Sequence, residues 1–150
     1  MSASYFVLIP ADPSRESPEN AEEIRTTLAK MLAARRSRLK DYGKLQFIDC
    51  GENFETIACP NCQAPITTKQ WHAWMDEDWH GEEGFHLHRH ETPCCGFDCT
   101  VNDLNYHCNQ GFARWFISAE IDQKANLIAE ELETLDRIAG FALKVIHQRY

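Results

Sequence analysis

Cysteines at metal-ligand spacing are the first feature of this chain that could do chemistry. Two of its seven cysteines, Cys59 and Cys62, form the stretch CPNC. Two thiolates separated by two residues can point at one tetrahedral zinc ion from a tight turn. Pro60 and Asn61 are residue types that favour such a turn. The spacing therefore predicts half of a zinc site.

The other half of the site has several candidates in the stretch TPCCGFDC, residues 92–99. A second CxxC pair usually follows the first after about 15–20 residues, whereas residues 63–93 intervene here. Adjacent cysteines can share a metal where the backbone turns sharply between them, and Gly96 permits that turn. We predict a site for Zn(II) built from four thiolates: Cys59, Cys62, Cys94 and Cys95.

Two other ligand sets stay open. Cys99 replaces Cys94 or Cys95 in the first, and a histidine replaces one sulfur in the second. In the preferred set, four thiolates close the coordination shell and leave no position for water. The predicted role of the metal is therefore structural, and no residue is assigned as catalytic.

Enzymatic interpretations rest on weaker patterns. His80-Gly81-Glu82 followed by Pro93-Cys94 partly matches the zinc deaminase signature, but Phe97 stands where that signature requires a cysteine. A thiol enzyme would need a cysteine whose surroundings lower its pKa. The cysteines outside the preferred ligand set are Cys50, Cys99 and Cys108.

A row of histidines gives a further metal hypothesis. His86, His88 and His90 alternate in HLHRH, so an extended strand would place them on one face. Such a row can hold a second metal with an open coordination position. The preferred interpretation is a solvent-facing row on a zinc-ribbon hairpin, with the second metal as the alternative.

Tryptophans and acidic residues crowd the stretch between the two cysteine groups. Thr67, with Gln70 three residues later, is a capping-box pattern and predicts the start of a short helix. Trp71, Trp74 and Trp79 would share one face of it, as a lid over the zinc module or as a partner surface. The opposite side is acidic, so we expect a protein partner, preferably a basic one.

The overall charge argues against a general nucleic-acid binder. The formal net charge is -8, and affinity for nucleic acid depends largely on Lys and Arg neutralising phosphates. One basic stretch, residues 35–44, is interpreted as a solvated helix end, with a phosphate contact as the alternative. The N-terminal apolar run 5–9 is too short for a signal or membrane segment, so the expected compartment is the cytoplasm. Cysteines in a reducing compartment favour metal binding over disulfides.

The elements that must position these groups lie on either side of residues 50–110. Residues 5–9 (YFVLI) predict a buried strand. Ser17 and Pro18 indicate a helix start, and apolar residues then recur at helical spacing. Residues 45–49 predict a second strand.

The same order of predicted elements, strand, helix and strand, recurs near the other end of the chain. Residues 112–121 predict a strand rich in aromatic and β-branched residues. Asp122 is the predicted N-cap of a helix that ends at Gly140, and residues 141–146 predict a closing strand. Without residues 50–110, the order is that of a ferredoxin-like βαββαβ sheet. We therefore expect one α+β domain, 1–150, with a zinc-ribbon-like module inserted between the second and third core strands.

Several motifs together resemble a family of small bacterial proteins, most of them uncharacterised. The resemblance is carried by YFVLIPADP, FIDCGENFETIACPNC, TPCCG, and NDLNY followed by GFARW. The family pattern has CPxC, PCCG and an NDLxY segment before a GFARF-like one. The resemblance implies the ligand set Cys59, Cys62, Cys94 and Cys95. It brings no established activity, although small acidic members could act as partners or inhibitors of other proteins. After Tyr106, HCNQG stands in place of the family's Trp-Pro-containing turn.

Overall fold

The core of the molecule is a four-stranded antiparallel sheet. The computed structural model describes residues 3–122 and 125–150. The strands are β1 (Ser4–Pro10), β2 (Arg36–Ile48), β8 (Gly111–Ile121) and β9 (Leu143–Arg149). Their order in the sheet is β2-β8-β1-β9, and every neighbouring pair is antiparallel. Nearly every side chain of the two central strands is buried, as their continuous apolar runs require.

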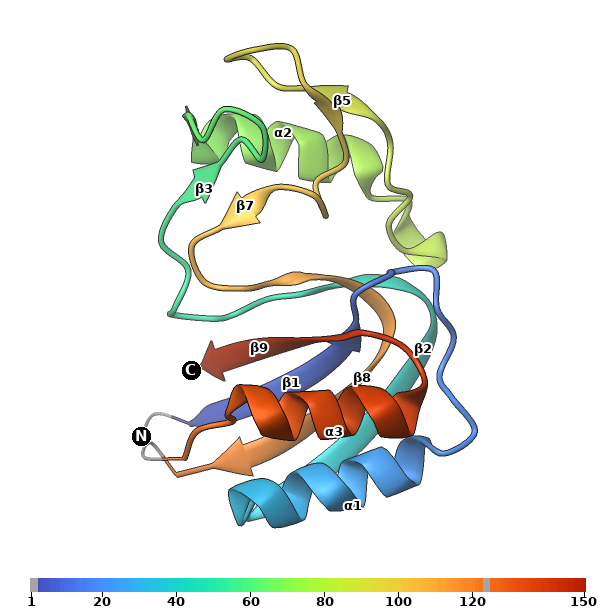
Figure 1. The fold of residues 1–150 in the computed structure, drawn as a ribbon. Coiled ribbons are helices and arrows are strands. Elements are labelled where there is room, and N and C mark those ends of the chain that lie inside the picture. Colours follow the sequence, from blue (N-terminus) through green and yellow to red (C-terminus); the bar gives the residue numbers. More distant parts are fainter. Residues whose placement is uncertain (1–2, 123–124) are drawn as a thin grey trace.

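Two helices cover one face of this sheet (Figure 1). They are α1 (Ala21–Leu32) and α3 (Ala129–Ala139), which lie side by side. Between the helices and the sheet lies an apolar cluster that includes Ile24, Leu28, Trp115, Ile117 and Leu135, all fully buried. This cluster is the principal core of the protein.

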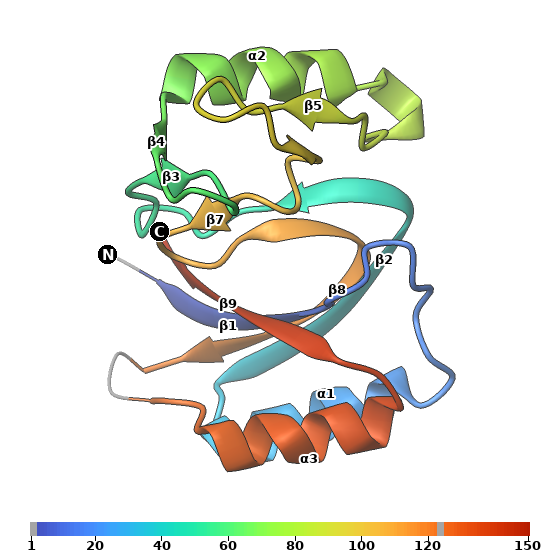
Figure 2. The same ribbon diagram turned by 45° about the horizontal axis from the view of Figure 1, so that its top comes forward.

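The cysteine-rich segment, residues 50–110, connects β2 to β8. Its strands are only two residues long: β3 (Ile57–Ala58), β4 (Pro65–Ile66), β5 (His90–Glu91), β6 (Asp98–Cys99) and β7 (Asn105–Tyr106). It also holds helix α2 (Thr68–Asp78) and a 3-10 turn, η1 (Gly81–Glu83). Figure 2 shows the sheet between α1 and α3 on one side and this segment on the other. The protein is thus a mixed α/β structure, with three α-helices in the described ranges.

Aromatic rings join the segment to the sheet. Phe47 of β2 and Phe112 of β8 belong to the segment's own buried cluster, whose other members include Trp71 and Tyr106. The ring of Phe47 lies 5.7 Å from Trp71, and that of Phe112 lies 5.1 Å from Phe85. The Phe85 amide also donates to the Leu45 carbonyl at 2.8 Å.

Both predicted starts of the outer helices are wrong. Helix α1 begins at Ala21, not at Pro18, because Asn20 is its N-cap residue. The Asn20 side chain does not cap α1, since Asn20 Nδ2 donates to Ile138 O of α3 at 2.6 Å. Helix α3 begins at Ala129 rather than after Asp122. There the Glu131 carboxylate accepts from the Ile128 amide at 3.1 Å, and a local hydrogen bond of this kind decides the start.

The basic stretch 35–44 is strand, not a helix end. It forms most of β2, which therefore starts well before the predicted strand 45–49. Residues Arg36 to Asp41 pair with β8, and the register shifts between Asp41 and Gln46. Pairing with a distant strand stabilises this edge, which short-range periodicity only partly indicates. The closing strand likewise runs later than predicted, over Leu143–Arg149.

Candidate metal centre

Four sulfurs converge where two turns of the cysteine-rich segment meet. The Sγ atoms of Cys59, Cys62, Cys94 and Cys95 all lie within 4.8 Å of one another. Cys59 Sγ lies 3.7 Å from Cys95 Sγ, and Cys62 Sγ lies 3.3 Å from Cys94 Sγ. These are the four cysteines that the sequence favours, and all seven cysteines are free thiols.

The spacing of these sulfurs suits a tetrahedral thiolate site. A zinc-sulfur bond of about 2.3 Å places the sulfurs of a tetrahedron about 3.8 Å apart. Four sulfur ligands in that arrangement are typical of zinc or iron-sulfur centres. The cluster could therefore hold a metal ion and is compatible with zinc.

The first pair of cysteines stands on a tight turn. The Cys59 amide donates to the Ala64 carbonyl at 2.9 Å, and the Gln63 amide donates to the Cys59 carbonyl at 3.0 Å. Gln63 has a left-handed φ of 65°, which a non-glycine residue adopts at a cost. The Gln63 side chain is held by Asn105, whose Nδ2 donates to Gln63 Oε1 at 2.8 Å.

The second turn repeats the backbone pattern of the first. The Thr92 amide donates to Phe97 O at 3.0 Å, and the Gly96 amide donates to Thr92 O at 2.8 Å. Gly96 has a φ of 69°, close to that of Gln63. TPCCG therefore has the same backbone hydrogen-bond pattern as CPNCQ. Thr92 corresponds to Cys59, and Cys95 corresponds to Cys62. Cys94, which corresponds to Asn61, provides the fourth sulfur.

Thr92 is a functional residue that the sequence analysis missed. It is 2% exposed, and its Oγ1 lies 3.5 Å from Cys59 Sγ and 3.6 Å from Cys95 Sγ. The same oxygen accepts from the Phe97 amide at 3.0 Å, so its hydrogen is available to a sulfur. Aligning TPCCG with CPNCQ would have identified Thr92, because it occupies the position of the predicted ligand Cys59.

Hydrogen bonds around the cluster favour thiolates at Cys59 and Cys95. Desolvation opposes ionisation of Cys59, but the Cys62 amide and Thr92 outweigh it and lower the pKa of Cys59 to about 6. Asn61 Nδ2, 3.6 Å from Cys95 Sγ, and then Thr92 lower the pKa of Cys95. The Ala64 amide favours a thiolate at Cys62, yet the neighbouring sulfurs raise its pKa. Four thiolates this close repel one another, and a cation between them would remove that repulsion.

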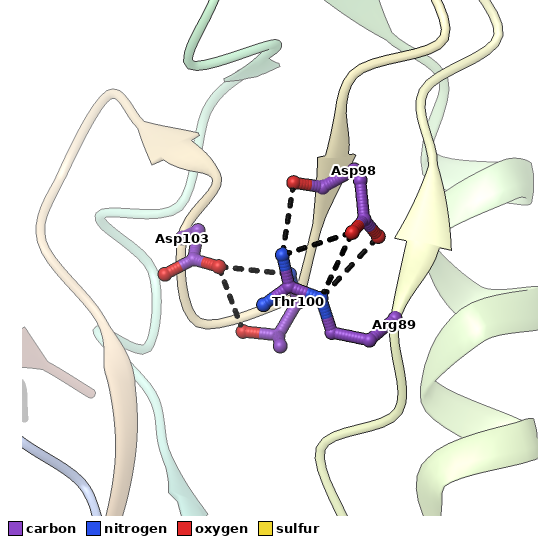
Figure 3. A network of polar contacts seen from close by, with 4 residues as sticks. All are labelled: Arg89, Asp98, Thr100 and Asp103. Carbon is purple, nitrogen blue, oxygen red and sulfur yellow. Dashed lines mark hydrogen bonds and ion pairs between the residues drawn. The ribbon is translucent and has the colours of Figure 1, made fainter.

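Polar contacts brace the arm that carries Cys94 and Cys95. Figure 3 shows Arg89 against Asp98, across the base of the β5–β6 hairpin. Arg89 Nε lies 3.3 Å from both carboxylate oxygens of Asp98, and the Arg89 guanidinium also donates to Asp98 O at 3.2 Å. In the following turn, Asp103 Oδ2 accepts from the Thr100 amide at 2.8 Å. Both contacts are solvent-exposed, so they orient the arm more than they stabilise it.

The remaining cysteines lie apart from the cluster. Cys99, the alternative ligand, is 2% exposed in the segment's apolar cluster, and burial raises its pKa to about 11. Burial also raises the pKa of Cys50 to about 11, and Cys50 Sγ donates to Gln110 Oε1 at 3.3 Å. Cys108 packs against a third apolar cluster on the sheet. The settings of Cys50 and Cys99 oppose a reactive thiolate.

The three tryptophans do not form one surface. Helix α2 begins as predicted, with Thr67 Oγ1 accepting from the Gln70 amide at 3.1 Å. Trp71 and Trp74 are each 7% exposed and belong to the segment's core. Trp79, the C-cap residue of α2, is 49% exposed. Only Trp79 of the three is therefore accessible to a partner.

The row of three histidines is also divided. His90 is buried, its ring stacks on Trp74 at 5.2 Å, and its Nε2 bonds Asp78 Oδ1 at 3.0 Å. His86 and His88 are exposed, with ring centroids 6.4 Å apart. The prediction of one shared face is wrong, because the side chain of His90 packs inward.

A hollow lies on the sheet at the basic edge. Its volume is about 480 Å³, and its lining includes Tyr5, Arg36, Arg38 and Phe116. Acidic groups also line it, and Arg36 Nε lies 3.5 Å from the Glu120 carboxylate. The hollow therefore carries both signs of charge rather than a basic patch.

Comparisons with known proteins assign no function to the site. No family model, no curated protein and no solved structure matches this chain. Within the described residues, the helices lack the length and apolar character that a membrane crossing requires. Function must therefore be inferred from the residues themselves.

Proposed function

We propose that Cys59, Cys62, Cys94 and Cys95 hold one zinc ion in a closed structural site. The observation that carries this proposal is the convergence of the four sulfurs within 4.8 Å. The paired turns support it, because each one is closed by its own backbone hydrogen bonds and carries two of the four cysteines. The resemblance to the small bacterial family supports the same ligands.

We further propose that residues 50–110 are a zinc-ribbon-like module inserted into a ferredoxin-like sheet, within one domain spanning 1–150. The sheet order β2-β8-β1-β9 and the two helices on one face support this topology. The module's strands are two residues long, so few ladder hydrogen bonds stabilise it. Zinc binding would supply folding free energy on the order of 10 kcal/mol, as in zinc-finger peptides.

The module's role is protein binding rather than catalysis. A shell of four thiolates leaves no ligand position for substrate or water. Its surface offers two exposed aromatic side chains, Trp79 at 49% and Phe97 at 38%. Acidic side chains, Asp76, Glu77 and Glu82, are also exposed. Aromatic anchors beside acidic groups suit a basic protein partner.

Metal analysis and cobalt substitution test the zinc site. The purified protein should contain zinc, and cobalt in its place should give the intense sulfur-to-metal absorption of four thiolates. Cys59→Ser and Cys95→Ser should lose that absorption, whereas the matched variant Cys50→Ser should keep it. Equal loss from Cys50→Ser would contradict the ligand assignment. A five-coordinate cobalt spectrum would favour an open, enzyme-like site.

Crosslinking in extracts of the native host, with the zinc-loaded protein as bait, tests the partner surface. Trp79→Ala should lose the crosslinked partner while retaining the four-thiolate spectrum. Tyr42→Ala is the matched control, because Tyr42 is an exposed aromatic of the sheet, 36% exposed, outside the module. Loss of the partner from Tyr42→Ala alone would move the interaction to the sheet.

A further inference from the structure

A second group of metal-ligating side chains lies on a hairpin away from the four cysteines. The hairpin joins the end of α2 to residue 86 through η1. The His80 amide donates to Gly84 O at 2.8 Å, and the His86 amide donates to Asp78 O at 2.8 Å. Gly84 has a φ of 77°, and a Cβ there would meet the Leu45 carbonyl oxygen. The hairpin is therefore held against β2 by its backbone.

The alternation of this hairpin separates apolar and ligating groups. Trp79 and Phe85 are bridge partners, with ring centroids 5.1 Å apart, and Phe85 packs on Phe112 of β8. Side chains of the adjacent positions point to the other side of such a ladder. His80 and His86 meet there, with ring centroids 3.9 Å apart.

We propose that His80, Glu83 and His86 bind a second divalent metal ion, with His88 as a fourth ligand. One ligand atom from each of the first three side chains lies within 4.8 Å of the others. His80 Nε2 lies 3.0 Å from His88 Nε2. Nitrogens bound at about 2.0–2.1 Å to a tetrahedral metal lie about 3.3 Å apart, so small side-chain adjustments complete the site.

The chemistry of the donors selects the class of metal. Two imidazoles and one carboxylate are a ligand set that zinc uses in open sites, and imidazole also suits nickel and copper. All three ligands are exposed, so an ion reaches them directly from solvent. We therefore assign an exchangeable site with nitrogen and oxygen ligands, unlike the four-cysteine cluster with its sulfur ligands.

Acidic residues at the end of α2 lie next to the hairpin in the sequence, and their contacts involve His90. Asp78 is fully buried beneath it, and among the described residues its Oδ2 has no hydrogen-bond partner. Its Oδ1 bonds His90 Nε2 at 3.0 Å, and His90 Nδ1 lies 3.7 Å from the Glu77 carboxylate. These contacts engage both ring nitrogens of His90, so His90 is not assigned to the second site.

Stoichiometric metal titration with the full chain tests this assignment. Protein carrying zinc in the cysteine cluster is titrated with Co²⁺ and then with a mild chelator. We expect a second equivalent whose spectrum lacks sulfur-to-metal absorption and which the chelator removes first. His80→Ala and His86→Ala should lose that equivalent and keep the four-thiolate spectrum of fully cobalt-substituted protein.

His72→Ala is the matched control, because His72 is an exposed histidine of α2 outside the hairpin, and it should bind both equivalents. If a histidine variant loses the four-thiolate spectrum through misfolding, Glu83→Gln is the deciding variant. It should weaken binding of the second metal equivalent and leave the four-thiolate spectrum unchanged. A single equivalent in the unmodified protein would overturn the proposal. So would a second equivalent that survives His80→Ala or Glu83→Gln, or one that His72→Ala also removes.

Discussion

The sheet with its two helices and the cysteine-rich segment are stabilised in different ways. Strands of the sheet are 7 to 13 residues long, and its main core is an apolar cluster. Strands of the segment have two residues each, and its core includes Cys59, Cys99 and the polar rings of Trp71 and Tyr106. The sheet gains stability from burial and long hydrogen-bonded ladders, whereas the segment has short ladders and four cysteines that could hold a metal ion.

Tyr106 shows how the segment compensates for its small core. Its hydroxyl accepts from Trp71 Nε1 at 3.0 Å and donates to Val101 O at 2.6 Å. Buried polar rings that are fully hydrogen-bonded specify one arrangement. In the sheet core, most buried side chains are aliphatic, and Trp115 donates from Nε1 to Arg15 O at 3.0 Å. The cysteine cluster that could bind a metal thus lies in the region with the smaller apolar core.

Removal of the proposed zinc ion should have the largest effect, and it should be confined to the segment. A strong chelator would eliminate binding free energy on the order of 10 kcal/mol. We expect amides of residues 57–66 and 90–99 to lose protection from hydrogen exchange, while those of β1 and β8 keep it. Exchange monitored by mass spectrometry checks this. Simultaneous loss of protection in β1 would show that the two regions do not fold separately.

A cavity in the sheet core should have the next largest effect. Leu135 is fully buried between α3 and the sheet, so Leu135→Ala should cost about 2–5 kcal/mol in the free energy of unfolding. Urea denaturation followed by circular dichroism measures the change. The cost should be the same with and without chelator, and Leu132→Ala, at a half-buried position of α3, should cost less.

Loss of the Thr92 hydroxyl should have a smaller effect, limited to metal affinity and the second turn. Thr92→Val removes the acceptor of the Phe97 amide and the hydroxyl that lies between Cys59 Sγ and Cys95 Sγ, at a cost of about 1–3 kcal/mol. Zinc competition with a coloured chelator measures it. The double variant Thr92→Cys/Cys94→Asn converts TPCCG to a CxxC turn, and it should retain a four-thiolate cobalt spectrum. Failure of that variant to bind metal would refute the equivalence of the two turns.

The smallest expected effect concerns pH and the sheet. The His147 ring lies 4.9 Å from the ring of Phe6. Desolvation, followed by the charge of Arg149, lowers the pKa of His147 from 6.5. The unfolded chain therefore binds this proton more readily, so stability should be complete above pH 6.5 and decline below it. His147→Gln should flatten that decline in urea titrations with chelator present. An unchanged decline would assign the pH dependence to other groups.

The strands and helices were predictable where apolar residues recur within one element. Residues 5–9 and 112–121 lie in β1 and β8, and Leu28 and Leu135 face the core as their spacing predicts. The start of α2 was predictable from its cap residue Thr67, but the start of α1 was not, because the side chain of Asn20 donates to α3 instead. The strand formed by residues 36–44 was also not predicted, because it pairs with β8, which is distant in the sequence.

Local spacing by itself determined that the CPNC and TPCCG stretches would turn and present cysteines, because proline, glycine and sulfur act over a few bonds. Only the tertiary structure decided which residues meet. Thr92 lies against Cys59, and Cys99 lies in the apolar cluster. The histidine that lies beside His86 is His80, whereas the sequence predicted His90 on the same face. Those outcomes depend on the direction of side chains packed against distant strands, and such contacts leave no periodic trace in the sequence.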